Sequence, residues 1–220
     1  MYYKLNHDLS AKVVGRSHPQ VDCLTIFQAQ FLDSDHLYNP KPKLKYKLRK
    51  SAKLTDVINE DSAISKASGL LINKKVKSIL LRYNLMRHQY IETSLELSNG
   101  DILQYYWLHL SDPDLITTID FPNSILYRTE WTFRKEDIVK LDSFDDYKKM
   151  KKMKNIEEGN LSFGVKFEQI VFSERFNRSL DMFAFLPLDS SIYISQNLKN
   201  ELVENQITGL LFEEANNIIS

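Results

Sequence analysis

The segment YIETSLELSNGDILQYYWLHL, residues 90–110, constrains the fold most, because it predicts a β-hairpin. Apolar residues and Thr alternate with polar residues from Ile91 to Ser98, which is the period of a strand with one wet face. Asn99–Gly100 predicts a tight type I′ turn, in which both residues have positive φ angles. The return strand after the turn is apolar on both faces, so we expect it to lie near the centre of a sheet.

Two other segments share one pattern, a strand followed by a small polar residue, a helix and a second strand. The first is Leu70–Ile91, where Asn73 is the expected N-cap, and the second is Ile192–Phe212, where Ser195 has that role and Gly209 makes the turn. Both helices carry an apolar stripe at helical spacing, formed in the first by Val76, Ile79, Leu80 and Tyr83 and in the second by Leu198 and Leu202.

The remaining length and composition fit an α+β protein. A chain of 220 residues with 43% hydrophobic content can bury one sizeable core, and its 12 Phe and 11 Tyr suit packed strands. We therefore expect a mixed, mostly antiparallel sheet with a few short helices, including the two strand–cap–helix–strand units. Residues 1–220 are predicted to form one domain, or two subdomains that share one core with a boundary near residues 125–160.

Cysteine usage and hydropathy bear on the compartment. Cys23 is the single cysteine, so an internal disulfide is excluded, and we expect it to be a small buried hydrophobe. The first 15 residues lack the apolar core of a signal peptide, and no apolar run approaches the length that spans a membrane. These features predict a cytoplasmic protein without a membrane partner.

Charge is balanced overall but unevenly distributed. Lys and Arg total 29, as do Asp and Glu, yet residues 1–155 hold 25 basic and 19 acidic groups, and residues 156–220 hold 4 and 10. The stretch Lys41–Lys53 carries seven positive side chains and no acid. Its basic residues alternate with Leu44, Tyr46 and Leu48, which predicts an edge strand protected by lysines rather than a disordered nucleic-acid arm.

The sequence shows no constellation with the spacing of a catalytic or cofactor site. The five histidines are scattered, and there is no Gly-rich phosphate loop and no nucleophile elbow. We therefore expect no catalytic residues, no cofactor and no metal. The alternative is a magnesium site formed by Asp112, Asp114 and Asp120, although these aspartates also suit turns and loops that bond to their own backbone.

The order of several segments resembles a bacterial family of immunity proteins of polymorphic toxin systems, the eleventh family in the usual enumeration. The resemblance covers most of the chain, although residues 6–52 and 125–168 carry little of the pattern, and the family has Ser more often than Asn at position 73. The matching segments are YYKL (Tyr2–Leu5), KLTDVI (Lys53–Ile58), LLINKKVKSILLRYNL, YYWLHL, TIDFPNS (Thr118–Ser124), DMFAFL (Asp181–Leu186) and IYISQNLKNELVENQITGLLF (Ile192–Phe212).

This resemblance implies a non-enzymatic antidote that binds and neutralises one cognate toxin domain in the cytosol. From the uneven charge, we expect toxin contacts on a basic set or an acidic set of residues. These sets are Lys43, Lys45, Lys47 and Arg49, and Glu201, Glu204, Glu213 and Glu214. A small metal- or phosphate-dependent enzyme that uses the three aspartates is the alternative. A nucleic-acid module on Lys41–Lys53 is less expected because the net charge is zero, and the sequence leaves the oligomeric state open.

Overall fold

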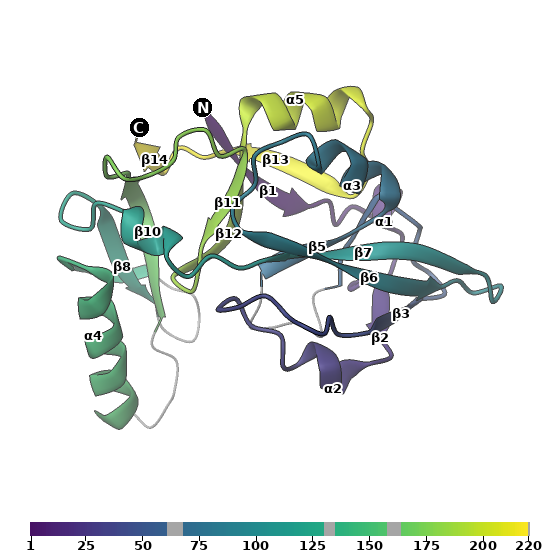
Figure 1. The fold of residues 1–220 in the computed structure, drawn as a ribbon, viewed down its shortest axis with the longest axis horizontal. Coiled ribbons are helices and arrows are strands. Elements are labelled where there is room, and N and C mark those ends of the chain that lie inside the picture. The colour runs from purple at the N-terminus through teal and green to yellow at the C-terminus, as the bar shows by residue number, and fades with distance from the viewer. Residues whose placement is uncertain (61–67, 130–134, 158–163, 220) are drawn as a thin grey trace. The chain divides into compact units, whose positions relative to one another are not determined.

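The computed structural model describes residues 1–60, 68–129, 135–157 and 164–219, and Figure 1 shows their fold. The chain divides into two compact units. Unit 1 comprises Met1–Pro113, Ser179–Ala184 and Ser191–Glu214, and unit 2 comprises Asp114–Arg178, Phe185–Ser190 and Ala215–Ser220. The single domain over residues 1–220 stays a prediction.

The α+β class is confirmed, and most neighbouring strands run antiparallel. In chain order, the described elements are β1 Tyr2–His7, α1 Ala11–Val14, β2 Val21–Cys23, α2 Ile26–Ala29, β3 Leu44–Leu48, β4 Val57–Ile58, β5 Ser68–Ile72, α3 Lys74–Leu80, β6 His88–Glu96, β7 Ile102–Leu110, the 3₁₀ helix η1 Leu115–Thr118, β8 Ile125–Thr129, β9 Lys135–Val139, α4 Phe144–Glu157, β10 Gly164–Val171, β11 Met182–Phe185, β12 Asp189–Ser195, α5 Gln196–Glu204, β13 Leu210–Glu214 and β14 Ile218–Ile219.

The predicted hairpin is present as β6 and β7, the two central strands of a sheet with the order β2-β3-β6-β7-β5-β4. The predicted type I′ turn is wrong. Gly100 has a φ of 89°, whereas Asn99 does not have a positive φ. Gly100 N donates to Leu97 O at 3.0 Å and Leu97 N to Asp101 O at 2.8 Å, so the loop has three residues and ends in a glycine bulge.

The edge-strand prediction for the basic stretch is also wrong. Strand β3 lies between β2, with which it is antiparallel, and β6, with which it is parallel. The short strand Val21–Cys23 carries no distinctive pattern, which is why the sequence did not reveal the neighbour that covers this edge. Cys23 is half-buried against the core rather than fully buried.

One face of this sheet forms a core against the segment that contains α2. Trp107 is 4% exposed within it. The other members include Val21, Leu32, Leu44, Tyr46, Ile58, Leu71, Ile91, Leu95 and Tyr105. The opposite face is covered by α3, whose buried residues are Val76, Ile79 and Leu80, as the stripe predicts. Asn73 is the confirmed N-cap, since its side chain accepts a hydrogen bond from Val76 N at 3.0 Å. The helix ends before Tyr83.

The second sheet of unit 1 has the order β11-β12-β1-β13 and carries α5. Ser195 is the confirmed N-cap, because its Oγ accepts from Leu198 N at 3.2 Å. Helices α3 and α5 lie side by side (Figure 1), and Lys75 Nζ donates to Asn205 O at 2.6 Å between them.

The two predicted strand–cap–helix–strand units prove to be parts of two structural repeats. Repeat A consists of β4, β5, α3, β6 and β7, and repeat B consists of β11, β12, α5, β13 and β1. In each repeat the strands before and after the helix are both antiparallel to a third strand that lies between them. That middle strand is β7 in repeat A, directly after the unit, and β1 in repeat B, at the other end of the sequence.

Each N-cap is held by an aspartate. Asn73 Nδ2 donates to Asp56 Oδ1 at 2.7 Å, and Ser195 Oγ donates to Asp181 Oδ1 at 2.6 Å. The second carboxylate oxygen of each aspartate accepts a backbone N–H from the other repeat. Thr208 N donates to Asp56 at 2.8 Å, and Asn84 N donates to Asp181 at 3.0 Å. The two repeats are therefore joined by a reciprocal pair of bonds.

Unit 2 is built on a sheet with the order β14-β10-β8-β9. Phe172 stacks on Phe176 with a centroid distance of 3.9 Å, and Leu126 and Ile170 are fully buried. Helix α4 has acidic residues in its first turn, where their negative charges interact favourably with the helix dipole. None of the helices in the described ranges combines the length and apolar character needed to span a membrane.

Candidate functional site

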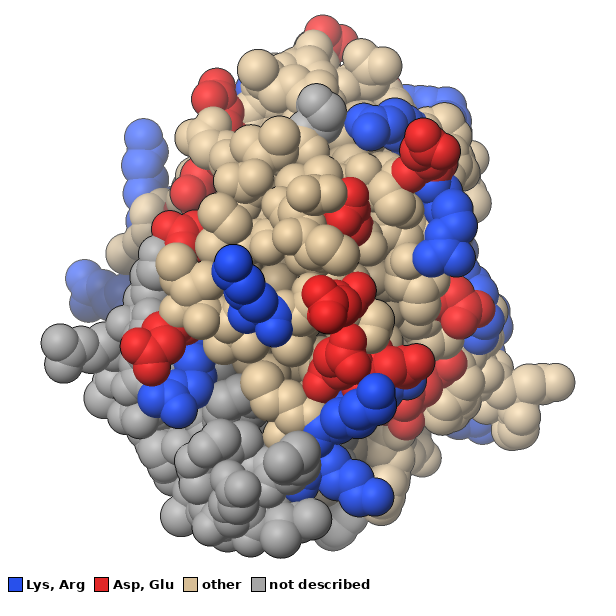
Figure 2. All heavy atoms as spheres, turned by 90° about the vertical axis from the view of Figure 1, so that its left-hand side faces the viewer, with Lys and Arg blue, Asp and Glu red and all other residues tan. Residues whose placement is uncertain are grey.

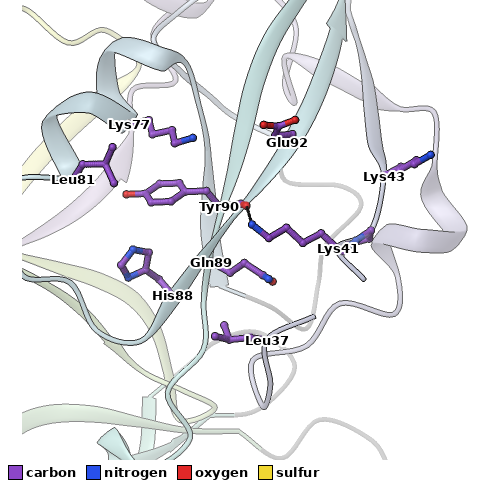
Figure 3. A pocket seen from close by; sticks show the side chains of 10 residues that line it. Leu37, Lys41, Lys43, Lys77, Leu81, His88, Gln89, Tyr90 and Glu92 are labelled. Carbon is purple, nitrogen blue, oxygen red and sulfur yellow. Dashed lines mark hydrogen bonds between the residues drawn. The ribbon is translucent and has the colours of Figure 1, made fainter. Parts of the chain in front are cut away.

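A groove in unit 1 lies beside β6, between the C-terminal end of α3 and the segment that leads into β3 (Figure 3). Its volume is about 870 Å³. The residues that line it are Leu37, Lys41, Pro42, Lys43, Lys77, Leu81, His88, Gln89, Tyr90 and Glu92. We call this site the lysine groove.

The floor of the lysine groove is aromatic. Strand β6 places Tyr90 in the groove, and α3 places Lys77 beside it (Figure 3). Lys77 Nζ lies 3.8 Å from the centroid of the Tyr106 ring and 5.3 Å from that of Tyr90. Two cation–π contacts thus hold the ammonium group over the sheet, where its positive charge faces the groove.

The outer wall is the segment before β3, and it is tied to β6 by hydrogen bonds. Lys41 Nζ donates to Tyr90 O at 3.0 Å (Figure 3). Tyr38 N donates to Gln89 Oε1 at 3.0 Å, and Gln89 Nε2 donates back to Tyr38 O at 2.9 Å. Lys43 follows with an exposed side chain. These bonds give the wall a defined position relative to the floor.

The side chain of His88 and the hydroxyl group of Tyr90 add polar atoms to the lining. His88 Nδ1 lies 2.9 Å from Met86 O, and since a carbonyl only accepts, Nδ1 is the donor in this contact. Burial raises the pKa of Tyr90 to about 12, so its hydroxyl is neutral at pH 7. Within the described ranges, that buried hydroxyl has no hydrogen-bond partner.

The lysine groove is electrostatically distinct. Three lysines line it and Glu92 is the one acidic lining residue. On the face in Figure 2, by contrast, acidic and basic side chains are interspersed among the coloured residues. A concave site that is lined by three lysines, one of them over aromatic rings, is suited to bind carboxylate or other anionic groups next to an apolar side chain.

The structure separates the predicted basic set. Lys43 lines the groove, and Lys45 is exposed on β3 opposite Ser94. Lys47 Nζ instead pairs with Glu96 at 2.5 Å, and Arg49 pairs with Asp22 at 2.7 Å. The charges of Lys47 and Arg49 are thus balanced by acidic residues of neighbouring strands. Lys43 and Lys45 are exposed, so their charges are accessible to a partner.

The predicted acidic set lies on repeat B. Glu201 of α5 pairs with Arg82, and so it links the two repeats. Glu204 is exposed at the end of the same helix. Glu213 and Glu214 are exposed on β13, where Glu213 accepts from Asn6 Nδ2 at 3.3 Å. Whether either set contacts a partner stays a prediction.

Sequence reasoning missed Lys77, His88 and Tyr90 as groove residues. A signal was present for two of them. Tyr90 shares one face of the predicted strand with Glu92 by alternation, and His88, two residues before Tyr90, continues that face in β6. Lys77 directly follows the buried Val76 on α3, but the contact between that helix and β6 could not be deduced from spacing.

The alternative aspartate site is not brought together within one unit. Asp112 belongs to unit 1, and Asp114 and Asp120 belong to unit 2. Asp120 holds its own loop, since Asn123 N donates to its Oδ1 at 3.3 Å and Asn123 Nδ2 to its Oδ2 at 2.9 Å. In the described part of the chain, no three His, Cys, Asp or Glu side chains are grouped to hold a metal ion.

Comparison of the sequence with protein-family models and with curated proteins gave no match.

Proposed function

We propose that the protein is a non-enzymatic immunity protein, which binds and neutralises a cognate bacterial toxin domain in the cytoplasm. The order of the segments that resemble the immunity family supports this proposal, as does the lysine groove. The observation that carries it is the groove itself, which is lined by Lys41, Lys43 and Lys77 together with Tyr90 and the exposed Leu81.

These features suit a protein partner better than a small molecule. Leu81 has an exposed fraction of 64%, so a partner that covers the groove also removes apolar surface from water. Lysines around such a contact select an acidic surface and accelerate association. A buried aromatic or apolar anchor slows dissociation, which an antidote needs because the toxin must stay blocked. The toxin is therefore expected to present carboxylates to the lysine groove.

Charge reversal in the groove tests this proposal. The variant Lys41→Glu/Lys43→Glu is compared with the single variant Lys50→Glu, which changes an exposed lysine after β3 that does not line the groove. The proposal expects the neighbouring gene to encode the toxin, so the binding partner is the C-terminal domain of that gene's product, and the readouts are its affinity and growth rescue on co-expression. Circular dichroism verifies that each variant is folded.

We expect the groove variant to weaken binding about tenfold or more and to lose growth rescue, because each rim charge contributes to steering and to the bound state. Lys50→Glu is expected to bind as the wild type does. Unchanged affinity of a folded groove variant would reject the groove as the toxin contact, and substrate turnover by the purified protein would reject the non-enzymatic reading.

A further inference from the structure

The two repeats match residue by residue, without a gap, from Leu70–Glu92 to Ile192–Glu214 and from Tyr105–Ser111 to Tyr2–Asp8. Tyr106 lies between Ile72 and Glu92 in its sheet, and Tyr3 lies between Ile194 and Glu214 in the other. The fourth residue after each N-cap is a lysine over that tyrosine. Lys77 Nζ is 3.8 Å from the Tyr106 ring, and Lys199 Nζ is 4.2 Å from the Tyr3 ring.

The backbone hydrogen bonds show the same equivalence. Ser111 N donates to Arg87 O at 2.9 Å, and Asp8 N donates to Gly209 O at 3.1 Å. Because backbone groups alternate in direction along a strand, the N–H and C=O of Tyr90 point away from β7, and those of its equivalent Phe212 point away from β1. The outer edge of β13 therefore corresponds to the outer edge of β6 at the lysine groove.

In repeat A this outer edge is occupied by the chain itself. The outward carbonyl of Tyr90 accepts a hydrogen bond from Lys41 Nζ at 3.0 Å, and the segment that carries Lys41 continues into β3, which pairs with β6. An extended, lysine-bearing segment thus lies along the outer edge of β6, which is equivalent to the outer edge of β13. Its Lys41 side chain bonds at Tyr90, and its backbone pairs with β6 from Thr93 onward.

In repeat B, β13 is the last strand of its sheet among the described residues. The backbone groups that point away from β1 begin at Thr208, whose carbonyl accepts a hydrogen bond from Val57 N at 3.1 Å. By the same alternation, the N–H and C=O groups of Leu210, Phe212 and Glu214 also point away from β1. Acidic and apolar side chains flank it and are exposed, namely Glu204, Glu213, Glu214, Val203 and Leu211.

We propose that β13 is a second docking edge, which pairs with an extended, lysine-bearing segment of the partner. The outward groups of Leu210, Phe212 and Glu214 form the backbone bonds of strand addition. A partner lysine donates to Phe212 O as Lys41 does to Tyr90 O, and the neighbouring glutamates select it by charge. That this partner is a toxin domain rests on the proposed function, whereas the chemistry of the edge does not.

A synthetic peptide tests the edge without any toxin. The probe is fluorescein-labelled KPKLKYKLR, the sequence of residues 41–49, which carries the lysine that docks in repeat A. Binding is measured by fluorescence anisotropy, and the site is mapped by amide chemical shifts in NMR. We expect shifts at Leu210–Glu214 that saturate with the peptide.

Matched variants separate charge from backbone pairing. Glu213→Lys/Glu214→Lys is expected to weaken binding about tenfold, because each exposed pair contributes a modest amount. The charge-matched control is Asp142→Lys/Glu174→Lys, which changes two exposed acids of unit 2 and is expected to bind normally. Glu214→Pro is expected to bind more weakly than Glu214→Gln, since both lose the charge and only proline lacks the outward N–H.

The outcomes are decisive for the edge alone. Three results would each overturn the proposal. The first is the absence of saturable peptide binding, and the second is a shift of β6 amides without a shift of β13 amides. The third is equal affinity of the Glu213→Lys/Glu214→Lys variant and its control. A failed toxin assay with the lysine-groove variant would leave a positive peptide result in place, so failure of this inference and failure of the proposed function are distinguishable.

Discussion

Replacing Asp56 by Asn is expected to destabilise unit 1, because this carboxylate joins the two repeats. It accepts hydrogen bonds from Thr208 N at 2.8 Å, from Thr208 Oγ1 at 2.8 Å and from Asn73 Nδ2 at 2.7 Å. Asparagine at position 56 has no charge, and its NH₂ group replaces one of the two carboxylate oxygens. A donor that bonded to that oxygen then faces another donor. Hydrogen bonds to a charged group contribute roughly 1.5–3 kcal/mol each, and the half-buried position favours the low end. The amide keeps one oxygen, so one or two of the three bonds are lost, and at about 1.5 kcal/mol each the expected loss is about 1.5–3 kcal/mol.

The stabilisation that the Asp56 carboxylate contributes decreases as the pH is lowered. Burial raises the pKa of Asp56, but the hydrogen bonds from Thr208 and Asn73 outweigh this effect and leave the pKa below its ordinary value. The stabilisation is therefore complete above the unfolded pKa of about 4 and disappears as the pH falls through the folded pKa. The difference between wild type and Asp56→Asn should shrink below about pH 4.

Urea unfolding at pH 7 and pH 3 measures both quantities, and hydrogen exchange of the Thr208 amide reports the bond directly. Asp35→Asn, at an exposed position, is the control. Asp181→Asn should cost less than Asp56→Asn, because its carboxylate accepts two such bonds, from Asn84 N and Ser195 Oγ. An Asp56→Asn protein within about 0.5 kcal/mol of the wild type at pH 7 would refute the reasoning.

Three further predictions follow from single residues. Gly209→Ala should lower the free energy of unfolding by more than about 1 kcal/mol in urea titrations, because Gly209 has a φ of 92° and an added Cβ would lie 2.1 Å from Val57 O. Tyr90→Phe should leave stability unchanged or raised in the same titration, since it removes a buried hydroxyl that lacks a partner among the described residues; a clear loss would contradict this. Burial lowers the pKa of His109, so its neutral form is favoured in the fold and stability should fall as the pH drops below about 6.5. Measured between pH 7 and pH 5, this decline should be smaller in His109→Gln.

Local signals in the sequence predicted much of unit 1. The alternation in residues 90–98, the caps Asn73 and Ser195 and the helix stripes each depend on neighbouring residues, so they could be deduced without the fold. The type I′ turn failed because Asn99–Gly100 also suits a three-residue loop with a glycine bulge, and the spacing alone does not distinguish them.

Long-range pairing explains what the sequence did not reveal. β3 was expected at an edge because its lysines alternate, yet β2 pairs with it over Val21–Cys23, three residues with no distinctive pattern. The repeat was visible only in part, since the middle strand of repeat B, YYKLNH at Tyr2–His7, stands far in sequence from its two partners, Asp189–Ser195 and Leu210–Glu214. The lysine groove depends on the contact between Lys77 of α3 and Tyr90 of β6, which no local spacing encodes.

The interleaving of β1 between β12 and β13 has a consequence for synthesis of the chain. The ribosome makes Tyr2–His7 long before both strands that flank it, which come from residues 189–214. Repeat A can form while this early strand has no sheet to join, so its backbone groups stay available to other chains until residues 189–214 have been made. Slowing elongation after residue 111 should therefore increase aggregation, and a soluble peptide that mimics β13 should reduce it.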